Sequence, residues 1–346
     1  NENATRNYSR HVRLEDFMFR RNGRKPFVFS KNNYYVLHSI LNLHTFTVQT
    51  LKITITNTAM KKFLLSVLLA AGCVALHAET PMVRQTRFEG RNITGVVAGS
   101  SFNVEVYQSD TTRAIVEIPA ELQEFLIFQI DGQGVVTLGL DYSWKKKNNV
   151  LNEIMRSLRS NGAQMKAKIY ITGLRVLKAS SSARIRPMTP LTGNSAELGI
   201  SSSGRIENLK LNATGRVRLA LSSSGRLTNA EIAAQDLDCT LSSSSSASLT
   251  HHGKSATFGQ SSSSRIDISG EVGSANIITS SSASFRGAGY NIGSATLGSS
   301  SSSRITVGVV QDLKATASSS SAIYYKGDPK TRQVSTSSSA KIRKEE

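Results

Sequence analysis

Basic side chains recur at one position of a repeated motif, and their type suits the binding of anions. The motif has three serines, a small residue, usually a basic residue, and then an apolar residue, as in Ser201-Ser202-Ser203-Gly204-Arg205-Ile206. The basic position is occupied in turn by Arg184, Arg205, Arg226, Ser248, Arg265, Ser284, Arg304, Ala322 and Lys341. A planar guanidinium matches carboxylate and phosphate groups. The six basic residues of this series therefore form a candidate ligand-binding stripe, and the alternative is that they lie over the surface and pair locally.

The serines of the motif provide many hydroxyls but lack an evident base. A serine nucleophile needs a neighbouring base, which is usually histidine. After residue 78 the histidines are His251 and His252, which are adjacent in the sequence. We therefore expect a structural role, in which the serines form tight corners and a ladder of hydroxyl groups. A polar surface for sugar and sites for O-linked glycans are the functional alternatives.

Other catalytic chemistry has little support in the sequence. A glycosidase needs two carboxylates that face each other across a groove, and Asp236 and Asp238 are the nearest such pair. No phosphate-binding glycine loop, zinc pattern or Cys/His cluster is present in the sequence. We expect a protein that is not an enzyme and that uses no metal or cofactor, with a polysaccharide lyase or hydrolase as the alternative.

The spacing of the motif predicts a solenoid. Nine copies end at Ile185, Ile206, Leu227, Leu249, Ile266, Phe285, Ile305, Ile323 and Ile342, with 17 to 22 residues between them. Apolar residues also recur three and five positions before the triplets, which is typical of a strand with one buried face. Each copy is therefore a strand, a serine corner and a second strand, and stacking buries the inner faces. The irregular period argues against hexapeptide repeats, and the Leu and Asn spacing of leucine-rich repeats is absent. We therefore expect a parallel, right-handed β-helix of about nine turns.

The remaining segments define the domain organisation. Residues 60–78 combine Met60-Lys61-Lys62, an apolar core too short to span a bilayer and a small-residue cleavage site at Ala78, which predicts a signal peptide. Residues 1–59 are then an upstream extension without structure. Residues 79–173 are expected to form a β-rich cap with an amphipathic helix near 148–160, and residues 174–346 form the serine-rich repeats.

The two cysteines cannot build a disulfide framework once the signal segment is removed. Cys239 occupies an inward strand position and is expected to act as a small buried hydrophobe. Cys73 lies in a sequence similar to a lipoprotein processing box, so lipidation there is an alternative to cleavage after Ala78. Membrane contact is expected only if Cys73 is lipidated, and either route exports the protein.

The charge balance favours an anionic partner. The formal net charge is +18, and residues 79–346 keep 31 Lys and Arg against 21 acids. Such an excess suits acidic glycans or membrane headgroups, and a solvated surface is the alternative. Nucleic acid is not expected, because aromatic residues are not interleaved with the basic ones. The last turn, near Ile342, would leave an open sheet edge at which two copies could associate.

Several of these features together resemble a known family. The leader, the stretch 88–106, the Glu117-Ile118-Pro119 strand, the Asp131-Gly132 hairpin and the serial Ser-Ser-Ser-Gly-Arg-Ile motifs are similar to the auto-transporter adhesin, head GIN domain family. The resemblance covers roughly residues 82–346 and implies a β-helix in the periplasm, outer membrane or cell surface of a Gram-negative bacterium. It assigns no catalytic residues. We therefore expect an exported adhesion, binding or scaffold protein that contacts an anionic polysaccharide or another envelope component through the stripe.

Overall fold

A computed structural model describes residues 80–142, 147–160 and 162–346 of the chain. The expected extension at 1–59, the signal segment at 60–78 and Cys73 lie outside these residues, so those expectations stay predictions. Within the described ranges, no helix has both the length and the apolar character needed to cross a membrane. The segment Glu79–Glu346 forms one compact unit.

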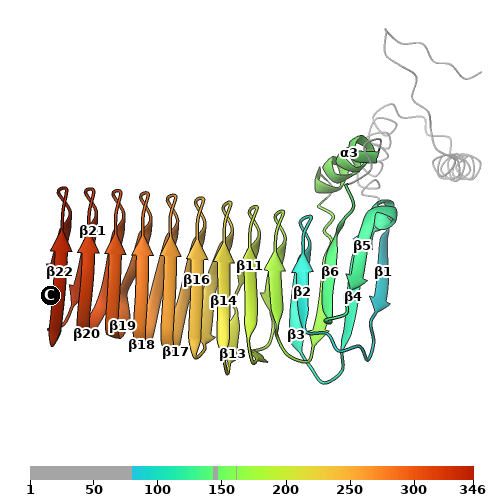
Figure 1. Cartoon of the computed structure of the whole chain (residues 1–346). Coiled ribbons are helices and arrows are strands. Elements are labelled where there is room, and N and C mark those ends of the chain that lie inside the picture. The colour runs from blue at the N-terminus through green and yellow to red at the C-terminus, as the bar shows by residue number, and fades with distance from the viewer. Residues whose placement is uncertain (1–79, 143–146, 161) are drawn as a thin grey trace, which may run out of the picture. The chain divides into compact units, whose positions relative to one another are not determined.

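This unit is a parallel β-solenoid whose coils stand side by side from β2 to β22 (Figure 1), so the expected fold class is confirmed. Strands that precede a serine corner are β2 (Gly95–Ala98), β8 (Val176–Ala179), β11 (Ala196–Ile200), β14 (Arg216–Leu221), β16 (Asp236–Leu241) and β22 (Thr331–Thr336). Strands that follow a corner are β3 (Asn103–Gln108), β9 (Arg184–Pro187), β12 (Arg205–Glu207), β15 (Arg226–Ala233), β21 (Ala322–Lys326) and β23 (Lys341–Lys344). Strands β10 (Leu191–Gly193) and β13 (Lys210–Ala213) lie between corners. Four longer strands run from one corner to the next: β17 (Ser246–Gln260), β18 (Arg265–Thr279), β19 (Ser284–Ser299) and β20 (Arg304–Ala317).

Apolar side chains fill the inside of every coil. The residue after the basic position points inward, so Ile185, Ile206 and Leu227 stack in register and are at most 1% exposed. Full burial of one such side chain contributes roughly 1.5–3 kcal/mol. Cys239 is a free, buried thiol in this core, as expected, and burial raises its pKa. The core is thus one continuous and mainly apolar column, with His251 among its few buried polar members.

The serine corners turn the chain by placing two consecutive serines in the left-handed region. At one corner Ser202 has φ 47° and Ser203 has φ 61°, and the same pair of positions repeats at the other corners. The Ser203 backbone N–H donates to the Ser223 carbonyl of the next coil at 3.0 Å, so the ladder of hydrogen bonds continues through the corner. Left-handed residues other than glycine cost on the order of 1 kcal/mol each, and this ladder offsets that cost.

The expected ladder of serine hydroxyls is not what connects the corners. At the nine corners between Ser181 and Ser339, the two left-handed serines expose their side chains, and in the described structure their hydroxyls make no hydrogen bonds to the protein. The connection is made by the backbone. The position after the triplet is the one that is buried, and where it is a serine, as in Ser245, its hydroxyl donates to the Leu221 carbonyl at 3.2 Å. Each of these nine corners therefore presents two free hydroxyls to solvent.

The fourth copy is aligned differently from the prediction. The corner uses the first part of the run 242–246, because Ser243 and Ser244 are the left-handed residues. Ser246, not Ser248, therefore occupies the basic position beside Arg226, and Ala247, not Leu249, is the inward residue that follows it. A register shift between Leu227 and Ala230 then restores the pairing of the later residues. The five-serine run contained no information on which triplet would form the corner.

The solenoid also begins earlier than residue 174. Gly99-Ser100-Ser101-Phe102-Asn103 forms a corner of the same kind, with Ser100 and Ser101 left-handed. Asn103 pairs in register with Arg184, so β2 and β3 form a coil of the solenoid and not a part of the cap. Sequence analysis missed this corner because it has only two serines and Phe102 at the small position.

The cap consists of strands that cover the first coil. They are β1 (Met82–Arg87), β4 (Arg113–Pro119), β5 (Leu126–Ile130), β6 (Val135–Leu140) and β7 (Lys166–Ile171), with a 3-10 helix η1 (Ala120–Phe125) and the α-helix α3 (Lys147–Ser160). β6 and β7 pair in parallel with β2 and β3, whereas β1 and β4 are antiparallel. The predicted helix near 148–160 is present, and its Leu151 and Leu158 are buried in the main core. At the other end, β22 has exposed side chains throughout, and self-association there stays a prediction.

Candidate functional site: a basic column beside the serine corners

The basic residues of the motif form one straight column on the strands that follow the corners. In-register pairing places Arg184, Arg205 and Arg226 on successive coils. The column then continues through Ser246, Arg265, Ser284, Arg304, Ala322 and Lys341. Coils stack about 4.8 Å apart, so neighbouring members of this series are separated by about that distance. We call the series from Arg184 to Lys341 the basic column.

A second column of outward side chains lies two residues further along each strand. It consists of Glu105, Arg186, Glu207, Thr228, Ser248, Asp267, Arg286, Thr306, Tyr324 and Arg343. We call it the flanking column. Because side chains alternate along a strand, positions two apart share one face. Sequence analysis did not identify this column, although the two-residue spacing after each basic position could have revealed it.

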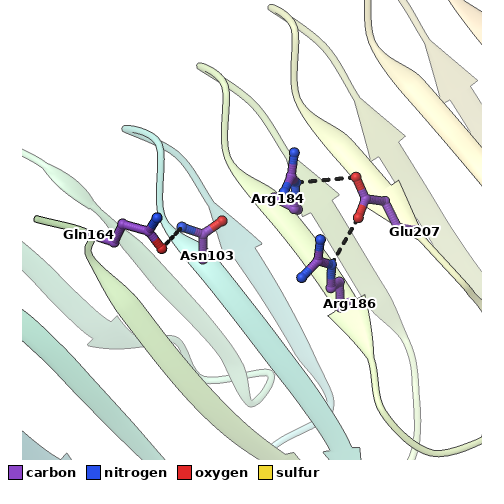
Figure 2. Close-up of polar contacts among 5 residues, drawn as sticks. All are labelled: Asn103, Gln164, Arg184, Arg186 and Glu207. Carbon is purple, nitrogen blue, oxygen red and sulfur yellow. Dashed lines mark hydrogen bonds and ion pairs between the residues drawn. The ribbon is translucent and has the colours of Figure 1, made fainter. Parts of the chain in front are cut away.

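Glu207 of the flanking column holds two arginines at once. Its carboxylate lies 3.2 Å from Arg184 Nε and 2.9 Å from Arg186 Nε, and Figure 2 shows the two guanidinium groups converging on it. The Glu207 side chain is 18% exposed, whereas those of Arg184 and Arg186 are 35% and 48% exposed. The charge of Arg184, the first arginine of the column, is therefore neutralised by local pairing, as the alternative interpretation of the stripe expected.

Three further arginines of the column lack such a partner. Among the described residues, no carboxylate oxygen lies within 4.0 Å of Arg205, Arg226 or Arg265. Arg226 and Arg265 are exposed, and Arg205 is half-buried. Arg304 lies with its guanidinium carbon 5.9 Å from the centre of the Tyr324 ring, a cation–π contact. The column therefore presents uncompensated positive charge from its second member onward.

A cleft lies where the column begins, between the first coils and the cap. It has a volume of 390 Å³ and is lined by both acids and bases, including Glu105, Glu117, Lys166, Lys168, Arg184 and Arg186. Asn103 donates to Gln164 across it at 3.4 Å (Figure 2). Glu105 is 3.5 Å from Lys168, and Glu117 is 3.9 Å from Arg84. The charges of this cleft are thus largely compensated by one another.

The strands that precede the corners carry a different charge pattern. There Arg218 lies in register between Glu197 on one neighbouring coil and Asp238 on the other. Glu197 is 2.7 Å from Lys178, and Asp236 is 3.6 Å from Arg216. Acids and bases therefore alternate on this face, and an anion would meet no continuous positive surface.

Two of the residues considered for catalysis, His251 and Asp236, are committed to other contacts. His251 is fully buried, and its Nδ1 lies 2.7 Å from the Tyr290 hydroxyl inside the solenoid, away from the exposed serines of the corners. Asp236 accepts a hydrogen bond from Ser255 at 2.6 Å besides its contact with Arg216. Among the described residues, no group of three or more His, Cys, Asp or Glu is arranged to hold a metal ion.

Comparison with known proteins assigns the class of protein. The family model for "putative auto-transporter adhesin, head GIN domain" matches residues 92–230 and 208–329, and the chain belongs to this family. Membership supports a role in surface adhesion or binding and an extracellular or envelope location. Family membership also favours a protein that is not an enzyme.

Solved structures show the same fold. A putative adhesin from Parabacteroides merdae is 14% identical with a TM-score of 0.54, and it matches 78% of this chain and 98% of its own. A putative lipid binding protein from Parabacteroides distasonis is 19% identical with a TM-score of 0.54 and the same coverage. A putative adhesin from Parabacteroides distasonis is 15% identical with a TM-score of 0.52, over 77% and 98%. No curated protein sequence matches this chain.

Proposed function

We propose that this protein is an exported adhesion protein that holds an anionic glycan along the basic column. The observation that carries the proposal is the lack of carboxylate partners at Arg205, Arg226 and Arg265, on a face where every coil adds one member to a straight series. Unpaired arginines of this kind sum to a positive field that attracts a linear polyanion. Each guanidinium then donates paired hydrogen bonds to a carboxylate, sulfate or phosphate group.

A glycan fits this surface better than other polyanions. The exposed hydroxyls of the serine corners run beside the column along the same direction, and they both donate and accept hydrogen bonds. Sugars offer the same kind of groups. Family membership, which indicates surface adhesion or binding, supports a carbohydrate at the cell surface over nucleic acid.

The proposal is tested with an array of acidic and neutral glycans, probed with the full chain at low and at raised salt. Serine occurs naturally in the column at Ser246 and Ser284, so Arg→Ser is compatible with the coil. We expect the triple variant Arg205→Ser, Arg226→Ser, Arg265→Ser to bind acidic glycans at least about tenfold more weakly, since each exposed charge contributes up to roughly 1 kcal/mol. Raised salt should also weaken the binding of acidic glycans by the wild-type protein.

Two matched variants make the test specific. Arg218→Ser removes an exposed arginine from the face that precedes the corners and should leave binding unchanged. Arg184→Ser removes the arginine that Glu207 already neutralises and should have a small effect. The same loss per removed charge in all variants would show that only net charge matters. No binding of any acidic glycan by the wild-type protein would contradict the proposal.

A further inference from the structure

A groove runs beside the C-terminal half of the basic column. It has a volume of 710 Å³ and crosses five coils, from β15 to β20. Its lining is rich in hydroxyls and carries charges of both signs, and it includes Ser248, Thr250, Ser269, Asp267, Arg286 and Arg304. Register shifts within the strand pairs β15–β17, β18–β19 and β19–β20 lie in this region, where the strands bend.

The charged groups of the groove are available to a ligand. Arg286 and Asp267 are 3.8 Å apart, with side chains 55% and 49% exposed, and an ion pair this exposed contributes little stability. Its members can therefore turn to a ligand at small cost. Asp267 can accept hydrogen bonds from sugar hydroxyls, and Arg286 can donate to a carboxylate or to ring oxygens. The hydroxyls of Thr250 and Ser269, 3.2 Å apart, extend this polar lining.

The spacing of the column differs along this groove. From Arg226 onward the basic residues occupy every second coil, at Arg265, Arg304 and Lys341, and the residues between them are Ser246, Ser284 and Ala322. Two coils correspond to about 10 Å. One sugar unit advances a linear polysaccharide by about the same distance as one coil advances the solenoid. A charge on alternate sugar units therefore matches a charge on alternate coils.

We propose that this groove and the alternate-coil arginines form a binding site for a linear polysaccharide that carries one acidic group per disaccharide. Acidic units lie against Arg226, Arg265 and Arg304, and the sugar rings lie in the groove with their hydroxyls on Ser248, Thr250, Asp267 and Ser269. This inference rests on the proposed function, because it names the class of glycan and the part of the column that selects it.

The test compares three hexasaccharides at equal concentration with the full chain by calorimetry. One alternates uronic acid with N-acetylhexosamine, one consists of uronic acid throughout, and one is neutral. We expect the alternating oligosaccharide to bind at least about tenfold more tightly than the neutral one, because two or three additional hydrogen bonds to charged groups supply that difference. It should also bind more tightly than the fully charged oligosaccharide, although it carries fewer charges.

Gly289 lines the groove, and the variant Gly289→Gln tests the contribution of the groove to binding independently of the basic column. A Cβ at Gly289 would meet only Ser269 Cβ, at 3.5 Å, so a side chain there fills the groove without distorting the backbone. We expect this variant to keep its thermal midpoint and its weak, salt-sensitive binding of acidic oligosaccharides, and to lose the preference for the alternating one. Ser284→Arg places arginines on three successive coils, from Arg265 to Arg304, and should shift the preference to the fully charged oligosaccharide.

The outcomes distinguish the two proposals. If the wild-type protein binds neither acidic oligosaccharide, the proposed function fails, and this inference fails with it. If it binds both acidic oligosaccharides equally, or if Gly289→Gln keeps the preference, the column binds anions but the groove does not select a disaccharide repeat. A preference lost in Gly289→Gln and reversed in Ser284→Arg would establish the site.

Discussion

The two faces that meet at each serine corner share a core and a hydrogen-bond ladder but differ in charge. On the face that precedes the corners, Arg218 lies between Glu197 and Asp238 on the neighbouring coils. On the face that follows them, Arg205 lies between Arg184 and Arg226. Stacking requires only that the inward residues be apolar, so it does not dictate either arrangement. The difference in charge between the two faces is therefore not a requirement of stacking.

The largest expected effect comes from breaking what the two faces share. Phe258 precedes a corner, Phe285 follows one, and their rings meet inside the solenoid with centroids 5.1 Å apart. Replacing either one by alanine leaves a cavity and should lower the free energy of unfolding by about 3–5 kcal/mol. Urea denaturation followed by circular dichroism measures this. A large loss from only one of the two would show that the faces do not depend on a common core.

The inside of the solenoid should also differ from its outside in its response to acid. Burial, with a smaller contribution from the charge of His252, lowers the pKa of His251 to about 4 from its ordinary value of 6.5. The unfolded chain therefore takes up a proton before the folded one does. Stability that is fully present above pH 6.5 should fall by on the order of 3 kcal/mol as the pH drops to about 4.

Two histidine variants check this pH dependence. His251→Leu removes the titrating group, so the unfolding midpoint should change much less between pH 6.5 and 4, even if it is lower overall. His252→Gln changes an exposed neighbour and should keep most of the wild-type slope. If the slope disappears in His252→Gln and persists in His251→Leu, the buried residue is not its source.

Much of the fold could be predicted because the repeated signal was strong. An apolar position and a serine triplet recur at near-constant spacing, and stacking is the way in which short strands of this kind bury their inner faces. The alignment failed where the signal was degenerate, at the five serines before Ala247, and where it was weak, at Ser100 and Ser101. In both places the position of the corner is visible in the backbone conformation but could not be read from the residue types.

The candidate site could be predicted only as a column. The six basic residues from Arg184 to Lys341 follow from the motif itself, whereas the fourth position is Ser246 and not the predicted Ser248. The division of the column into a neutralised part and a free part depends on Glu207, whose carboxylate contacts two arginines of the preceding coil. The groove beside the column lies where the strand pairs have register shifts, and no residue pattern predicted those shifts. Positions within a coil could be predicted from the sequence, whereas side-chain contacts between coils could be identified only from the structure.

A smaller effect is expected when the neutralised part of the column is released. Glu207→Gln frees Arg184 and Arg186 from their shared carboxylate and should raise the affinity for acidic glycans a few-fold at low salt, since one exposed charge contributes up to roughly 1 kcal/mol. Glu197→Gln makes the same change of net charge on the other face, where it frees Lys178. That variant should leave the affinity unchanged. An equal gain in affinity in both variants would mean that acidic glycans do not bind preferentially at the column.

The smallest effect concerns stability and should have opposite signs on the two faces. Arg205 has an arginine on each neighbouring coil, about 5 Å away along the stack, and repulsion at that distance costs up to about 1 kcal/mol per pair in water. Arg205→Ser should therefore raise the thermal midpoint slightly at low salt. Arg218→Ser removes an arginine that lies between two acids and should lower it. Both differences should shrink at high salt, because salt screens the charges of the exposed Arg218 and the half-buried Arg205. A midpoint that fell in both variants would show that Arg205 packs on its neighbours, and the positive charge of the column would then be too weak to hold an anionic partner.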